Sequence, residues 1–191
     1  MSLDLPGFAD PVLGAQAGFR AVLDALSRPG RIRPAGAGLT PPAPLEQAAA
    51  ALLLTLTDAE TPLWLDPAAA PARDWIGFHC GAPFVEDPAQ AAFVLALSMP
   101  DLARLQAGTD ESPERGATVI LQVEGFDGAR AFSLAGPGLP APARLAVAGL
   151  PPGFAAAWAD NRARFPRGID LILCAGDRLA ALPRSVTVRE G

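Results

Sequence analysis

Apolar residues recur at helical spacing near the start of the chain. Asp10 and Pro11, a capping residue followed by proline in the first helical position, predict the beginning of a helix. The segment 28–30, Arg-Pro-Gly, predicts its end. The spacing gives this helix two unlike sides. The apolar side carries Val12, Ala15, Phe19, Val22, Leu23 and Leu26, and the polar side carries Gln16, Arg20 and Asp24.

Another amphipathic helix is predicted to begin at Phe154. At about 100° per residue, four side chains share one of its faces and Asp160 lies opposite them. Pro166 cannot continue the helix, and Gly168 frees the backbone to turn. Because a buried amide needs hydrogen-bond partners, we expect Asn161 to bind the turn at 166–168. The shared face consists of Phe154, Trp158, Asn161 and Phe165.

The stretch 169–174 is apolar at both odd and even positions. That pattern is typical of a strand covered on both faces, as in a layered α/β protein. A short helical turn and a final strand are predicted to follow, up to Val188.

Helices and strands also alternate in the middle of the chain. The glycines at 125 and 128 predict a hairpin turn, with 131–134 returning beside a strand at 118–123. Interleaved elements with a central hairpin predict an α/β fold, one domain over residues 1–191, with a mixed β-sheet and helices on both faces. The other predicted elements are helices at 45–57, 70–80 and 101–107, and strands at 63–65 and within 88–99.

Composition narrows the class of protein. The net charge of −5 argues against a general binder of nucleic acid or acidic membranes, since both rely on basic fields. The longest apolar run, 48–57, is far shorter than the roughly 20 residues that a membrane-spanning helix needs. The first residues do not have the pattern of a secretion signal, and two cysteines without one indicate a reduced, cytoplasmic protein.

The absence of lysine removes whole classes of chemistry. All 15 cationic side chains are arginine, so neither a Schiff base to pyridoxal phosphate nor a Walker lysine is possible. One histidine and two cysteines cannot complete a usual four-ligand zinc site. His79 and Cys80 are adjacent and therefore point in different directions, so a structural or ligand-orienting role is expected for His79 rather than catalysis.

The loop at 108–116 carries carboxylates of the kind that bind divalent cations. No flanking ligand pattern supports a metal there, so a solvated loop is the preferred interpretation. We predict no metal, no cofactor and no catalytic residue.

The arginines form two groups in an acidic chain, one around 28–33 and one around 162–167. Guanidinium groups match phosphate and phosphonate oxygens, so one interpretation is a stand-alone phosphoester- or nucleotide-binding protein. The interpretation we favour is ion pairing, either with Asp160, Asp170 and Asp177 or with a partner subunit. The candidates for anion or partner contact are Arg28, Arg31, Arg162 and Arg167.

Short motifs form an ordered set along nearly the whole chain. The densest are at the C-terminal end: FPRGIDLIL at 165–173, GDRL at 176–179 and LPR at 182–184. Others are Gln16, FR at 19–20, SRPG at 27–30, LLTL at 53–56, TPLWL at 61–65, FH at 78–79, AP at 82–83, GT at 108–109, PE at 113–114 and GAT at 116–118. Taken together they resemble the PhnH family, whose members belong to the bacterial carbon–phosphorus (C–P) lyase system.

The resemblance implies a homodimer with a fold like the core of pyridoxal-phosphate-dependent transferases, without the cofactor. It also implies assembly with sister subunits G, I and J, and with L for the synthase step. In that step ATP and an alkylphosphonate give ribose 1-alkylphosphonate 5-triphosphate with release of adenine. Carbon–phosphorus bond cleavage belongs to the iron–sulfur subunit J. The resemblance carries over no catalytic residue, so the implied role is accessory.

Overall fold

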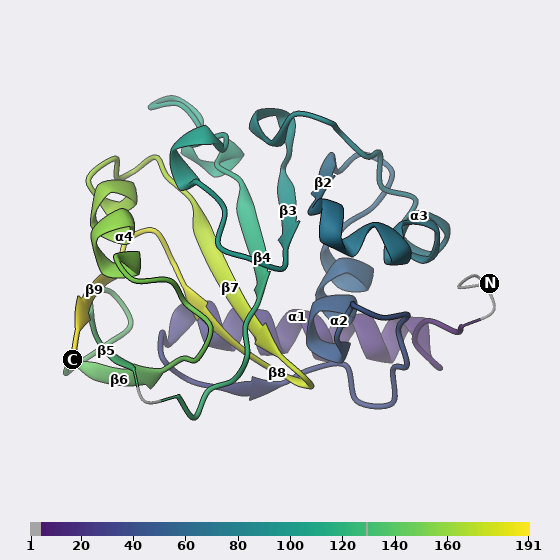
Figure 1. Ribbon diagram of the computed structural model, residues 1–191, viewed down its shortest axis with the longest axis horizontal. Helices are drawn as coiled ribbons and strands as arrows, with labels where there is room; N and C mark the ends of the chain where they lie inside the picture. The colour runs from purple at the N-terminus through teal and green to yellow at the C-terminus, as the bar shows by residue number, and fades with distance from the viewer. Residues whose placement is uncertain (1–4, 129) are drawn as a thin grey trace.

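The computed structural model describes residues 5–128 and 130–191 as two β-sheets with helices around them (Figure 1). The main sheet is six-stranded, in the order β1-β8-β7-β4-β3-β2. Its strands β2, β3, β4 and β7 run parallel, while β8 and β1 are antiparallel to their neighbours. The predicted α/β fold with a mixed sheet is confirmed. The strands are β1 (Arg33–Pro34), β2 (Leu63–Leu65), β3 (Phe93–Ala96), β4 (Thr118–Gln122), β7 (Asp170–Ala175) and β8 (Arg178–Leu182).

A second, three-stranded sheet has the order β6-β5-β9 and is antiparallel. The prediction that 131–134 returns as a hairpin beside 118–123 is therefore wrong. Both edges of β4 already bond parallel strands, β3 and β7, so β5 leaves the main sheet and pairs elsewhere. The strands of this sheet are β5 (Ala131–Ala135), β6 (Ala143–Ala146) and β9 (Thr187–Glu190).

Helices lie against both faces of the main sheet. Helices α1, α2 and α3 share one hydrophobic core with one face, and α4 and the small sheet share a second core with the other. The helix predicted at 70–80 is divided into a 3₁₀ segment and α3, and the one predicted at 101–107 is a single 3₁₀ turn. The helices are α1 (Pro11–Ser27), α2 (Gln47–Leu56), α3 (Arg73–Cys80) and α4 (Phe154–Arg162), with 3₁₀ segments η1 (Pro67–Ala72), η2 (Pro88–Gln90), η3 (Leu102–Arg104) and η4 (Pro113–Arg115).

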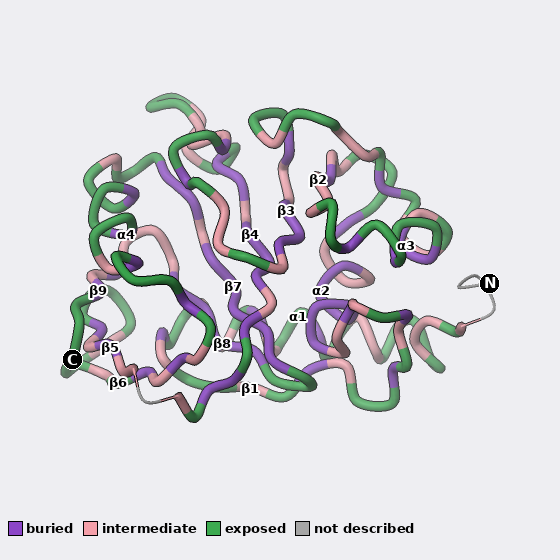
Figure 2. The backbone as a smooth tube through the Cα atoms, viewed as in Figure 1, coloured by how far each residue is buried: buried purple, intermediate pink, exposed green. Residues whose placement is uncertain are grey.

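Strand β7 lies between the two cores, and the tube in Figure 2 is buried along it. Leu171 and Leu173 belong to the core beneath α4, whereas Ile172 and Cys174 belong to the core beneath α1 and α2. This is the strand covered on both faces that the apolar run predicted. The segment after it is not the predicted helical turn: residues 178–182 form β8, which pairs antiparallel with β7. So short a segment cannot be assigned to a strand or a helical turn from its periodicity alone.

Helix α1 begins as predicted. The Asp10 carboxylate accepts hydrogen bonds from the backbone N–H groups of Val12 and Leu13, both at 3.0 Å. Its apolar side is split, however. Val22 is buried, but Phe19 and Leu23 keep 53% and 56% of their surface exposed.

Asn161 fixes the turn that leads from α4 into β7, as the sequence predicted. Its amide donates to the Ile169 carbonyl at 2.9 Å and accepts from the Ile169 N–H at 2.8 Å. The residue is buried, with 3% of its surface exposed. Phe165, placed on the same helical face by the 100° rule, instead lies beyond the end of α4 and is 61% exposed. Helix α4 therefore ends at Arg162, three residues before the end of the apolar pattern in the sequence.

Replacing Asn161 with alanine should destabilise the protein by about 2–3 kcal/mol, because both backbone groups of Ile169 would be buried without partners. Urea unfolding followed by circular dichroism measures this. Asp160→Ala, at the neighbouring exposed position, is the control and should change stability by less than about 0.5 kcal/mol. Equal unfolding midpoints for the two variants would contradict the assigned role of Asn161.

Candidate functional site

The first arginine group gathers around one carboxylate of α1. Arg28 and Arg33 both form ion pairs with Asp24. Arg33 belongs to β1, so Asp24 ties the end of α1 to the edge strand of the main sheet. Arg31 is exposed and has no ion pair with any residue that the structure describes.

The ion pairs at Asp24 change its acidity. The hydrogen bond from Arg33 is the largest influence and lowers the pKa of Asp24. Burial comes next and opposes it, and the charges of Arg33 and Arg28 lower the pKa further. One carboxylate balances only one of the two guanidinium charges, so the group keeps a net positive charge. Its Asp24 ion pairs hold Arg28 and Arg33 at the end of α1 and at β1.

The second arginine group begins at the last residue of α4 and continues through the turn after it. The Arg167 Nε lies 3.1 Å from the Asp110 carboxylate, and both side chains are exposed. The Arg162 Nε donates to the Ser185 carbonyl at 3.3 Å. Neither uses the expected partners Asp160, Asp170 or Asp177. The two groups also lie on different elements, one at the end of α1 and one at the end of α4 and after it.

Asp170 is bound by an arginine that the sequence reasoning missed. The Arg184 Nε lies 3.1 and 3.2 Å from the two Asp170 oxygens, and the same guanidinium donates to the Pro113 carbonyl at 2.6 Å. The antiparallel register of β7 and β8, which pairs Leu171 with Leu182, brings Arg184 beside Asp170. Identifying β8 as a strand would have placed Arg184 near Asp170, although the register itself puts Pro183 opposite that residue.

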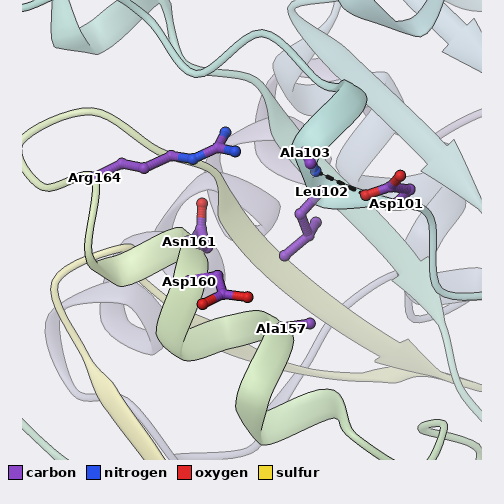
Figure 3. A pocket seen from close by; sticks show the side chains of 7 residues that line it. All are labelled: Asp101, Leu102, Ala103, Ala157, Asp160, Asn161 and Arg164. Carbon is purple, nitrogen blue, oxygen red and sulfur yellow. Dashed lines mark hydrogen bonds between the residues drawn. The ribbon is translucent and has the colours of Figure 1, made fainter.

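A small hollow lies between α4 and η3 (Figure 3). Arg164 extends from the turn after α4 toward η3, and the Asp101 carboxylate caps η3 by accepting from the Ala103 N–H at 3.0 Å. The volume of the hollow is about 90 Å³, whereas pockets for organic ligands hold roughly 300–1,000 Å³. Its lining residues are Asp101, Leu102, Ala103, Ala157, Asp160, Asn161 and Arg164.

His79 contacts the N-terminal segment rather than a reactive group. Its Nε2 lies 3.1 Å from the Leu5 carbonyl, which also accepts from the Trp75 indole N–H at 2.8 Å. The aromatic rings of Trp75 and Phe78 pack near the imidazole, with centroids 4.7 and 5.0 Å from it. This placement agrees with the structural role expected for His79.

Neither cysteine is set up as a nucleophile. Burial raises the pKa of the Cys80 thiol, against a smaller lowering by a hydrogen bond with Thr57. Burial also raises the pKa of the Cys174 thiol, and the nearby Glu46 charge adds to this. Both thiols therefore stay protonated at neutral pH and are poor nucleophiles.

The acidic loop at 108–116 contains η4 and the Asp110 carboxylate that Arg167 binds. Within residues 5–128 and 130–191, no three His, Cys, Asp or Glu side chains come together as metal ligands. Over the same residues, no helix is long and apolar enough to cross a membrane.

The geometry therefore defines an α/β protein whose candidate residues serve the fold or point outward. Residues 6–189 match the family model described as "Bacterial phosphonate metabolism protein (PhnH)", and the chain belongs to that family. The match spans both sheets and all four α-helices.

Two relatives are similar over most of their length. The chain is 42% identical over 183 residues to alpha-D-ribose 1-methylphosphonate 5-triphosphate synthase subunit PhnH of Rhizobium meliloti (strain 1021), covering 93% of this chain and 92% of the relative. It is 36% identical over 174 residues to the putative C-P lyase subunit protein HtxG of Stutzerimonas stutzeri, covering 91% and 85%.

Arg33→Ala should raise the pKa of Asp24 toward its ordinary value of 3.8, because Arg33 is the main cause of the lowering. NMR titration of the side-chain carboxyl carbons measures this. Since the pKa of Asp24 is lower in the folded state, its contribution to stability is complete above pH 3.8 and is lost as the pH falls through the folded value.

Arg130→Ala is the control. The Arg130 Nε lies 3.9 Å from a carboxylate oxygen of Glu190, which belongs to β9 and not to the helix that carries Asp24. This control should leave the pKa of Asp24 unchanged. An unchanged pKa in Arg33→Ala would show that the Arg33 ion pair does not form in solution.

Proposed function

We propose that this chain is an accessory, non-catalytic subunit of the complex that begins phosphonate breakdown in the carbon–phosphorus lyase system. The observation that carries the proposal is the family match over residues 6–189, together with a 42% identical relative that is named as a synthase subunit. The described residues support the accessory role. His79 is used to hold the N-terminal segment, and burial keeps both thiols protonated.

The resemblance to this family also suggests the partners of the chain. We propose that the chain assembles with subunits G, I and J, and acts with L when ATP and an alkylphosphonate are joined and adenine is released. Its surroundings would be the cytoplasm, where Cys80 and Cys174 remain as free thiols. The substrate contacts of that reaction would come from the sister subunits.

We also propose that residues 1–191 form one domain with a fold like the core of pyridoxal-phosphate-dependent transferases. The parallel strands β2, β3, β4 and β7 and the helices on both faces support this. Without lysine the chain cannot hold that cofactor as a Schiff base. A scaffold of this kind would share the packing of those enzymes without their chemistry.

A homodimer would cover the exposed part of α1. Val12, Phe19 and Leu23 are 76%, 53% and 56% exposed. At 100° per residue they lie within about 40° of one another around the helix. We call these three residues the α1 stripe. Exposed apolar side chains along one side of a surface helix are the kind of face that associates in water, and a two-fold axis would pair it with itself.

Light scattering after size-exclusion chromatography tests the assembly proposal. Alone, the chain should elute as a dimer of twice 19.6 kDa. Mixed with subunits G, I and J from the same organism, it should move into one larger particle. A chain that stays separate from these subunits would overturn the proposal. That result would favour the alternative of a stand-alone phosphoester- or nucleotide-binding protein.

The α1 stripe has its own test. Phe19→Glu should shift the chain alone to a mass of 19.6 kDa, because a charge would be buried in the interface. Leu13→Glu makes the same change at another exposed position of α1, about 100° from Val12, and should leave the dimer intact. A dimer that tolerates Phe19→Glu would place the interface elsewhere.

A further inference from the structure

An exposed aromatic ring stands beside an arginine at the end of α4. Phe165 is 61% exposed, and the exposed Arg162 lines the same hollow. It borders a hollow of about 380 Å³. The hollow is formed by three separate segments of the chain: the end of α4, the turn after β5 and the turn before β9. Its lining residues, which we call the Phe165 face, are Pro137, Arg162, Ala163, Phe165 and Ser185.

The walls of the Phe165 face are held in place by buried contacts behind it. The Trp158 indole N–H donates to the Val186 carbonyl at 2.8 Å, next to Ser185. Asn161 binds Ile169 through two hydrogen bonds and so fixes the turn that carries Phe165. On the rim, Arg162 donates to the Ser185 carbonyl at 3.3 Å. A face that is already ordered loses little conformational freedom when a partner binds, which favours affinity.

The charges around Phe165 indicate what kind of partner fits. Arg162 is exposed and forms no ion pair within the described part of the chain. Arg167, on the other side of Phe165 in the sequence, is paired only with the exposed Asp110. Exposed pairs of this kind contribute at most about 1 kcal/mol, so a carboxylate from a partner can replace Asp110. In a protein with a net charge of −5, this segment is one of the two arginine groups, the other lying around 28–33.

Aromatic and arginine side chains together are the residues most enriched at the centres of protein interfaces. A small phosphate ligand would require several donors that converge on one point. Here only Arg162 among the lining residues is cationic, and its neighbours are apolar or small. The composition therefore favours a protein surface over a free anion.

We propose that the Phe165 face is a docking site for another subunit of the complex, whose contacting segment presents an apolar side chain flanked by Asp or Glu. The apolar side chain enters the hollow against Phe165 and Pro137, and the carboxylates bind Arg162 and Arg167. This inference rests on the proposed function, and it names the surface and the chemistry by which the chain joins its partners.

Binding of the chain to a purified assembly of subunits G, I and J tests the proposal, with biolayer interferometry as the readout. Phe165→Ala and Arg162→Glu should each weaken binding at least about tenfold, the loss expected of a residue central to an interface. Rising salt should weaken the wild type more than Arg162→Ala, since the charge pair is screened. Thermal unfolding of each variant should match the wild type, because both side chains are exposed.

Two matched controls make the same changes elsewhere. Phe78 is 68% exposed on α3, and Arg104 is exposed on η3. Phe78→Ala and Arg104→Glu should leave the affinity within about twofold of the wild type, as expected of positions outside the interface.

The outcomes separate the two proposals. Unchanged affinity in both Phe165→Ala and Arg162→Glu, with the wild type binding, overturns the docking site and leaves the proposed function standing. A wild-type chain that does not bind the assembly at all overturns both. If Phe165→Ala loses the homodimer, the face contacts a second copy of this chain. If the isolated chain binds ATP or methylphosphonate and Arg162→Ala abolishes that binding, the face binds a small anion. Either result overturns the docking proposal.

Discussion

The burial of β7 on both faces is the constraint on which the rest of the structure depends. Leu171 and Leu173 need cover on one side of the sheet, and Ile172 and Cys174 need it on the other. Helices α1 and α2 supply one layer, while α4 and the small sheet supply the second. The chain must therefore cross from one layer into the sheet at 166–169, and Asn161 provides the hydrogen bonds that make this buried crossing stable. The motif at 165–173 lies on this junction.

The arginines divide into those that serve the fold and those that face outward. Arg33 and Arg184 each bind a carboxylate of a neighbouring element, and Arg28 binds Asp24 within its own helix end. Arg162 faces outward beside Phe165, and the pairing of Arg167 is fully on the surface. In an acidic protein with one buried and one partly buried thiol, both protonated, this distribution favours a role carried out through surfaces. Apolar side chains are exposed at the α1 stripe and at the Phe165 face, which the proposals above assign to partner contacts, and also at Leu13 and Phe78.

Local signals in the sequence predicted what depends on local physics. The Asp10 cap, the apolar run of β7 and the buried amide of Asn161 each have one dominant physical reason, and the structure confirms all three. Residues 131–134 were predicted to pair with the strand at 118–123, which is wrong. A turn signal in the sequence does not show which strand still has an edge free for backbone pairing. The exposure of Phe19 and Phe165 could not be predicted from the sequence. Amphipathic spacing does not distinguish an apolar side chain that is buried in the core of the chain from one that is exposed on its surface. Arg184 was missed because its partner is set by the β7–β8 register.

Turnover by the reconstituted complex tests the central claim most directly. Adenine release from ATP in the presence of methylphosphonate would be measured with this chain present, omitted, or replaced by a His79→Gln, Cys80→Ala double variant. If the chain is required but not catalytic, omission stops adenine release and the double variant restores it to within about twofold, since Gln can keep the hydrogen bond to the Leu5 carbonyl. A double variant that joins the complex but releases no adenine would show that the chain supplies a catalytic group.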